Sequence, residues 1–316
     1  MRAVVIDPQA PLRVGFTMVE PPVPADGEVL VRVKAISLNR GEVVYQAQQG
    51  EAGTRLGRDL AGVVDLPAAQ GPGPGQGARV VSFVDSGAWA EQVAVPVNAV
   101  AELPPSVTFA QAAALPTAGL TALAAIGYGG SLIARAVLVT GASGGVGLIA
   151  CRLASLAGAR VVGQVRQARS APPVQEAGAD RVVIGENLAA TAPFGPYHLI
   201  ADVVGGEPLA QVITQLAAGG TCVSIGPPSP AHATVPVDLG RMRQAPGACL
   251  RFFSFYQELE REPASSGLQR LVRLVGDGQL TPHLGAEADW SQIATLAQAL
   301  IDRRFTGKAV LHIPDQ

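Results

Sequence analysis

The stretch VLVTGASGGVGLIACRLA, residues 137–154, decides the fold of this chain. Its first residues are apolar and β-favouring, as in a buried strand, and its last residues repeat apolar side chains at helical spacing. Between them, Ala142, Gly144 and Gly147 have the spacing that a tight strand-to-helix turn requires. Such a turn presents free backbone N–H groups and the positive end of a helix dipole. The stretch therefore predicts a turn that binds the phosphates of a dinucleotide; the alternative is a tight turn whose glycines serve packing alone.

Strands and helices continue to alternate after this turn. Apolar, β-branched runs predict further strands at 160–165, 181–184, 198–204 and 220–226, with helices between them that include one over 207–217. This alternation is typical of a parallel sheet covered by helices on both faces.

The first hundred residues have a different character. Short β-branched runs, separated by turn residues, predict strands at 3–7, 28–38, 59–66, 78–84 and 90–96. Strands of this length and spacing favour a compact, barrel-like β domain. An Ala-rich helix is expected over about 110–125. The tail is mixed: the aromatic run 252–256 alternates like a buried strand, and helices near 265–276 and 290–302 precede a strand at 307–313.

Composition excludes several functions. The 23 basic and 25 acidic residues nearly balance, so the chain shows no electrostatic footprint for nucleic acid or an anionic membrane. Residues 103–134 carry no charge, but they are too poor in large aliphatic side chains for a membrane span. Three widely spaced cysteines favour a reducing, cytoplasmic location. Residues 1–150 contain neither Cys nor His, so this half cannot supply a conventional zinc site.

The choice between NAD and NADP depends on the residues after the second predicted strand. A carboxylate about 20 residues past the glycines holds the ribose 2′-hydroxyl of NAD in many such folds. No Asp or Glu occurs between Leu148 and Gln175, and Arg166 follows the strand directly. Because a guanidinium matches a 2′-phosphate, we expect NADPH as the cofactor; the alternative is that Arg166 is an ordinary surface charge.

In order along the chain, the motifs SLNRGEV (37–43), LGRDLAGVV (56–64), GAWAEQVAVP (87–96), VLVTGASGGVG (137–147), ADVVGGEPL (201–209) and FTGKAVL (305–311) resemble one family. It is the zinc-independent medium-chain dehydrogenase/reductase family, in its quinone oxidoreductase (zeta-crystallin-like) branch. The resemblance implies an α/β fold with a GroES-like β-barrel-type domain (1–108 and 257–316) and a Rossmann doubly wound parallel-sheet domain (109–256). It also implies NADPH bound between the domains, a homodimer and no metal ion.

The resemblance also implies site residues. Asn39, Tyr45 and Thr121 would form the catalytic site, with Thr121 near the nicotinamide. Residues expected to contact the cofactor are Thr121, Ser143, Gly144, Gly145, Val146, Arg166, Val204, Gly205, Ile225, Gly226, Phe252, Phe253 and Lys308. The family often has Tyr five residues after the Asn and Asp three after it, where this chain has Val44 and Glu42.

Some of these residues have simpler interpretations. Asn39 could form a turn instead of contacting substrate, and Tyr45 could fill the edge of a core. Asp59 is expected to make local backbone hydrogen bonds. Phe252 and Phe253 could pack in the core or in a dimer interface.

The predicted function is an NADPH-dependent oxidoreductase that transfers hydride to a small molecule, a quinone or an α,β-unsaturated carbonyl compound. Hydride transfer needs few acid–base side chains because the cofactor carries the chemistry. An enoyl-thioester reductase of polyketide or fatty-acid type and a non-catalytic NADPH-binding protein stay open as alternatives. The balanced charge does not favour an RNA-binding role.

Overall fold

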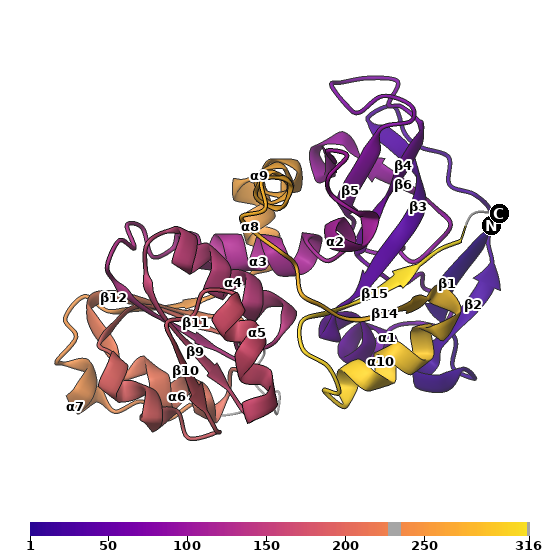
Figure 1. Ribbon diagram of the computed structural model, residues 1–316. Helices are drawn as coiled ribbons and strands as arrows, with labels where there is room; N and C mark the ends of the chain where they lie inside the picture. The colour runs from indigo at the N-terminus through magenta and orange to yellow at the C-terminus, as the bar shows by residue number, and fades with distance from the viewer. Residues whose placement is uncertain (227–234, 315–316) are drawn as a thin grey trace. The chain divides into compact units, whose positions relative to one another are not determined.

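A computed structural model describes residues 1–226 and 235–314 of the chain (Figure 1). The chain divides into two compact units, Met1–Leu120 with Leu259–Gln316, and Thr121–Glu258. The sequence places the first boundary at 108/109, whereas the contacts divide the chain at 120/121, within helix α3 (Pro116–Gly127). None of the helices in the described residues has the length and apolar character needed to cross a bilayer.

The first unit is built on a seven-stranded sheet with the order β14-β15-β3-β4-β5-β7, and β6 pairs with β3 beside this path. Its strands are β3 (Glu28–Leu38), β4 (Asp59–Leu66), β5 (Arg79–Phe83), β6 (Gln92–Pro96), β7 (Val100–Glu102), β14 (Leu284–Asp289) and β15 (Lys308–His312). β15 runs antiparallel to β3, with Ala309 opposite Leu38, so a late segment of the chain completes a sheet begun near its start. β1 (Arg2–Ile6) and β2 (Val14–Met18) form a separate antiparallel pair.

Short helices and turns link these strands. They are η1 (Pro11–Arg13), η2 (Gly41–Gln46), α1 (Ala47–Gln49), η3 (Val97–Ala99), α2 (Phe109–Ala113), α9 (Ala264–Gly276), η6 (Trp290–Gln292) and α10 (Ile293–Ile301). η2 is a π-helical turn that continues directly into α1. α9 is amphipathic, and its buried side chains include Leu268, Leu271 and Val275.

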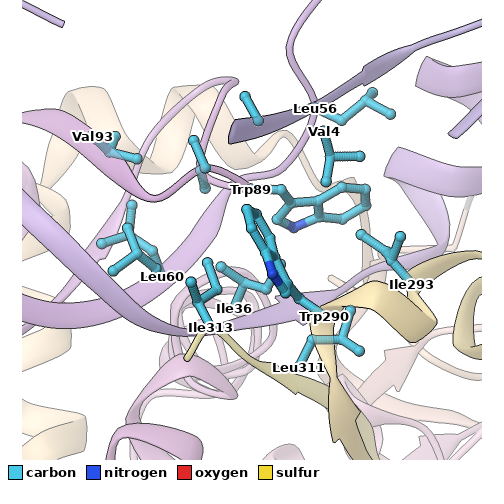
Figure 2. Close-up of a cluster of buried hydrophobic side chains, with 14 of the residues drawn as sticks. Val4, Ile36, Leu56, Leu60, Trp89, Val93, Trp290, Ile293, Leu311 and Ile313 are labelled. Atoms are coloured by element: carbon cyan, nitrogen blue, oxygen red, sulfur yellow. The ribbon is translucent and has the colours of Figure 1, made fainter. Parts of the chain in front are cut away.

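The core of the first unit gathers apolar side chains from segments far apart in the sequence (Figure 2). Trp89 and Trp290 are its largest members, and both are almost fully buried. The Trp89 Nε1–H donates to Ser37 O at 3.2 Å. Gly57 has a φ of 96°, and a Cβ there would lie 2.2 Å from Trp89 Cδ1. The first glycine of the LGRDLAGVV motif is therefore required by packing against Trp89.

The second unit contains a six-stranded sheet with the order β10-β9-β8-β11-β12-β13, and all paired neighbours are parallel. Its strands are β8 (Ala136–Thr140), β9 (Arg160–Val165), β10 (Arg181–Ile184), β11 (Tyr197–Asp202), β12 (Leu216–Ser224) and β13 (Cys249–Phe252). Counted from β8, this is the doubly wound dinucleotide-binding order, which reverses between β8 and β11. The predicted α/β fold class is confirmed.

The helical segments of the second unit are α4 (Gly145–Leu156), η4 (Ala168–Ser170), α5 (Ala171–Glu176), η5 (Leu188–Phe194), α6 (Glu207–Ile213) and α7 (Leu239–Met242), and α8 (Phe255–Arg261) begins in it. Buried apolar side chains of the sheet and of α6 form its core, among them Leu138, Ile200 and Val212.

Two predicted helices were wrong in their extent. The helix expected over 110–125 is divided into α2 and α3, because Pro116 lacks the N–H that would continue the first helix. The helix expected over 207–217 ends at Ile213, and β12 begins at Leu216.

The aromatic run 252–256 is not a buried strand. β13 ends at Phe252, whose side chain is 73% exposed, and α8 begins at Phe255. β13 is the outermost strand of its sheet, so side chains at its end are covered on fewer sides than those of central strands.

Candidate functional site

The turn between β8 and α4 has the geometry of a phosphate-binding loop. Gly141 follows β8 with a φ of 58°, and its O accepts a hydrogen bond from Gly144 N at 3.1 Å. The left-handed residue of the turn is therefore Gly141, one position before Ala142, which the spacing predicted for the tight turn. A Cβ on Gly147 would lie 2.6 Å from Ala142 Cα, so glycine there allows α4 to pack against the turn.

The N-terminus of α4 is open for a ligand. Gly144 is its N-cap residue, no side chain caps the helix, and its first turn contains no acidic residue. A Cβ on Gly144 would meet only Gly141 O, at 3.5 Å. Ser143, Gly144, Gly145 and Val146 are all half-buried. Backbone N–H groups and the helix dipole at this end suit a diphosphate.

Gln164 on β9 holds this turn in place. Its side chain is almost fully buried; its Oε1 accepts from Gly141 N at 3.1 Å, and its Nε2 donates to Gly185 O at 2.6 Å. The side chain thus joins the glycine turn to the end of β10. No role for Gln164 was predicted from the sequence, although a polar residue within the apolar run RVVGQV is a usable signal.

Asp202 organises the neighbouring strand ends. Its Oδ1 accepts from Thr140 Oγ1 at 2.6 Å, and its Oδ2 accepts from Gly205 N at 3.0 Å. Its backbone O accepts from Ile225 N at 2.8 Å and from Gly226 N at 3.1 Å. Burial raises the pKa of this carboxyl, while hydrogen bonds from Thr140 and two backbone N–H groups oppose the rise. Asp202 lies in the motif ADVVGGEPL, and no role for it was predicted from the sequence.

These hydrogen bonds bring the ends of β8, β11 and β12 together. Four predicted contacts therefore lie at the carboxyl ends of adjacent strands: Val204, Gly205, Ile225 and Gly226. Val204 is 41% exposed, whereas Gly205 is buried with a φ of 73°. Their contact with a cofactor stays a prediction.

Arg166 lies at the exposed end of β9. Its Nη1 is 3.9 Å from Glu186 Oε1, and both side chains face solvent. At this distance and exposure the ion pair is weak, so a bound 2′-phosphate can replace the carboxylate. No acid occurs between Leu148 and Gln175, but the fold brings Glu186 to Arg166 from beyond β10.

The other residues predicted to contact the cofactor differ in burial and in the unit to which they belong. Thr121 is buried in α3. Phe252 is exposed, and Phe253 is half-buried with its N donating to Ser224 O at 2.9 Å. Lys308 belongs to the first unit and is buried there. Their cofactor contacts stay predictions.

A buried polar cluster in the first unit surrounds Asp59, which is inaccessible to solvent. Its Oδ2 accepts from Ser37 Oγ at 2.9 Å, from Asn39 Nδ2 at 2.8 Å and from Lys308 Nζ at 3.2 Å. Its Oδ1 accepts from Thr117 N at 3.0 Å and from Thr117 Oγ1 at 2.5 Å. The expectation of purely local backbone bonds was therefore wrong: β3, α3 and β15 all contribute donors.

Asn39 uses both ends of its side-chain amide within this cluster. Its Nδ2 donates to Asp59, and its Oδ1 accepts from Lys308 Nζ at 2.5 Å. Its backbone N–H donates to Glu42 Oε2 at 2.7 Å, and Glu42 N donates to Asn39 O at 3.2 Å. The bond from Glu42 N to Asn39 O is that of a turn, as one of the two interpretations expects, and the contact of Asn39 with substrate stays a prediction. Tyr45 follows in η2 with 42% of its side chain exposed.

Metal-binding side chains are not clustered in the part of the chain that the structure describes. Within residues 1–226 and 235–314, no group of three or more His, Cys, Asp or Glu residues could hold an ion. Cys151 and Cys222 are buried, and Cys249 is exposed.

Residues 145–258 match the family described as zinc-binding dehydrogenase. The chain is 29% identical over 315 residues to a mycocerosic acid synthase-like polyketide synthase of Mycobacterium tuberculosis, covering 92% of this chain but only 14% of that protein. It is 28% identical over 314 residues to a chloroplast envelope quinone oxidoreductase homolog of Arabidopsis thaliana, covering 92% and 91% of the two chains. A mycobacterial protein solved in complex with NADPH has a TM-score of 0.85 and 26% identity, with 99% of both chains covered.

Proposed function

Because the chain belongs to the zinc-independent, quinone oxidoreductase-like branch of the medium-chain dehydrogenases/reductases, we propose that it transfers hydride from NADPH to quinones or to α,β-unsaturated carbonyl compounds. Whichever acceptor is used, the protein is an NADPH-dependent oxidoreductase of the medium-chain type.

One observation carries the proposal, namely the open α4 N-terminus beside Gly141 and Gly144. The uncapped backbone N–H groups can receive a diphosphate, and the space around Gly144 permits its close approach. We assign the 2′-phosphate to Arg166, which follows β9 directly and has only a weak, exposed ion pair with Glu186. The residues present therefore fit NADPH, which supplies a hydride when bound.

The remaining roles belong to side chains of this chain. Ser143, Gly145 and Val146 would bind the diphosphate through the start of α4. Residues proposed to line the nucleotide and the nicotinamide are Thr121, Val204, Gly205, Ile225, Gly226, Phe252, Phe253 and Lys308. Asn39 would orient the acceptor, and the exposed Tyr45 hydroxyl would donate the proton that completes the reduction.

An enoyl-thioester reductase is the second candidate. The observation that favours it is the similarity to a polyketide synthase, of which this chain spans 14% of the length. The two candidates share the hydride step and differ in the group attached to the carbonyl carbon.

The test follows NADPH absorbance with a panel of quinones, enones and enoyl thioesters of matched chain length. Turnover of quinones or simple enones, with thioesters slower by about tenfold or more, supports the first candidate. The reverse order replaces it with the second. NADPH binding measured by calorimetry without turnover of any acceptor overturns both and leaves a nucleotide-binding protein.

We further propose that the protein acts in the cytoplasm as a homodimer. Light scattering coupled to size-exclusion chromatography tests the dimer, and a monomeric mass at micromolar concentration contradicts it.

A further inference from the structure

The cluster around Asp59 contains two buried carboxyl groups. Asp59 and Glu42 are both fully inaccessible, and Lys308, which is 4% exposed, is the cation bonded to Asp59. Two ionised carboxylates beside one ammonium would leave a net negative charge in a buried site, which is costly. One carboxyl group therefore has a physical reason to keep its proton.

The hydrogen bonds identify which group is ionised. Asp59 accepts five hydrogen bonds, three on Oδ2 and two on Oδ1, and one of them comes from the Lys308 ammonium. These donors stabilise a negative charge. Glu42 has far fewer: its Oε2 accepts from Asn39 N at 2.7 Å and from Asn39 Nδ2 at 3.4 Å.

The second carboxyl oxygen of Glu42 also differs from the carboxyl oxygens of Asp59 in its hydrogen bonding. Glu42 Oε1 is buried and lacks a hydrogen-bond partner among the described residues. Ionisation of Glu42 would leave that oxygen charged and without a hydrogen bond. A neutral acid lowers the free-energy cost of burying the group.

We propose that Glu42 is a positioning residue that holds Asn39 in the acceptor site, and that it does so as a neutral carboxylic acid. In this state its Oε2 accepts from the Asn39 backbone without competing for Lys308. The ammonium then remains on Asp59 and on Asn39 Oδ1, and the Asn39 amide keeps one orientation. The protonation of Glu42 stands without the proposed function, while its effect on the acceptor rests on it.

The charged groups around Glu42 agree with this assignment. Burial is the main cause that raises its pKa, to about 8, and Asp59 on β4 adds to the rise. Lys308 on β15, the Asn39 backbone N–H and Arg58, which precedes β4, oppose it. Above about pH 8, Glu42 becomes a second anion that repels Asp59 and attracts Lys308 away from Asn39.

Two measurements test the assignment without turnover. The infrared difference between wild type and Glu42→Gln at about pH 7 should contain the carbonyl band of a protonated carboxylic acid, and this band should disappear above about pH 9. Glu51→Gln, a change at an exposed glutamate, is the matched control and should lack the band. The side-chain amide signal of Asn39 in a ¹⁵N-resolved NMR spectrum should shift over the same pH range in wild type and not in Glu42→Gln.

Kinetics then test the positioning role. We expect the KM for the acceptor to rise about fivefold or more between about pH 7 and about pH 9 in wild type, while Glu42→Gln keeps a low, pH-independent KM. Glu42→Ala should have a raised KM at both values.

Absence of the acid band, or an Asn39 signal insensitive to pH, overturns the assignment even when acceptors are turned over. If the acid band and the pH-dependent Asn39 shift are both observed but no acceptor is turned over, the protonation of Glu42 is supported. The proposed function and the role of Glu42 in positioning Asn39 for an acceptor are then both overturned. Turnover with the same rise in KM for wild type and Glu42→Gln overturns the positioning role.

Discussion

Replacing Gln164 with leucine is expected to loosen the glycine turn that we assign to the diphosphate. Leucine is similar to glutamine in volume, branches one carbon earlier and carries no polar atoms. The change removes the acceptor for Gly141 N and the donor to Gly185 O, which are 3.1 and 2.6 Å from the Gln164 side chain.

The size of the effect follows from the two groups left behind. Gly141 and Gly185 are half-buried, so each lost hydrogen bond costs about 0.5–1.5 kcal/mol, and the free energy of unfolding should fall by about 1–3 kcal/mol. In a unit of this size, that loss lowers the unfolding midpoint by about 3–12 °C. If the binding free energy of NADPH weakens by about 1–2 kcal/mol as the turn loosens, the Kd for NADPH rises about 5- to 30-fold.

Calorimetry supplies both readouts, as a thermal scan and as an NADPH titration at a temperature where the variant is folded. Gln175→Leu, on the exposed side of α5, is the control for a surface Gln-to-Leu change. An NADPH Kd for Gln164→Leu equal to that of wild type would refute the assignment of this turn.

Three further predictions concern other parts of the chain. Arg166→Ala should raise the Kd for NADPH about tenfold and leave the Kd for NADH unchanged, because a charge-assisted contact contributes about 1.5–3 kcal/mol; an unchanged ratio of the two constants would exclude this residue. Gly147→Ala should lower the unfolding midpoint, because the new Cβ clashes with Ala142 at a cost of about 1–3 kcal/mol. Gly127→Ala is the control, because a Cβ there meets nothing within 4 Å. Equal midpoints for the two variants would contradict the packing argument. The folded-state pKa of Glu42, about 8, lies above its ordinary value of 4.5, so the stability it contributes is fully present below about pH 4.5 and is lost as the pH rises through 8. Thermal scans from about pH 5 to about pH 9 should therefore show a smaller decline for Glu42→Gln than for wild type, and parallel curves would argue against a protonated Glu42.

The sequence predicted the elements whose pattern is set locally. The strand and helix around the glycine turn, the alternation that follows and the strand at 28–38 all have the expected place. These succeed because apolar periodicity and glycine spacing reflect the backbone geometry of a few consecutive residues. The aromatic run 252–256 failed because its periodicity resembles that of a buried strand, while its burial depends on its place at the edge of the sheet.

The contacts of polar side chains were harder to predict. Asp59 binds Lys308, which is 249 positions away, and Gln164 binds the residue after β8, which is 23 positions away. Neither pairing leaves a local pattern, because each depends on which strands become neighbours. Arg166 shows the same effect, since Glu186 reaches it only through the pairing of β9 with β10.

The position of β15 has a consequence for how the chain folds during synthesis. This strand lies between β14 and β3, so the first unit needs residues from both ends of the chain, whereas Thr121–Glu258 is continuous. During synthesis on the ribosome, Thr121–Glu258 can therefore complete its sheet first. The sheet of the first unit is completed only after β15 has been synthesised. Until Lys308 arrives, Asp59 lacks the ammonium that it binds in the described structure, and its carboxylate must remain hydrated. The step that completes the sheet is thus also the step that brings this cation to a carboxylate that is inaccessible to solvent.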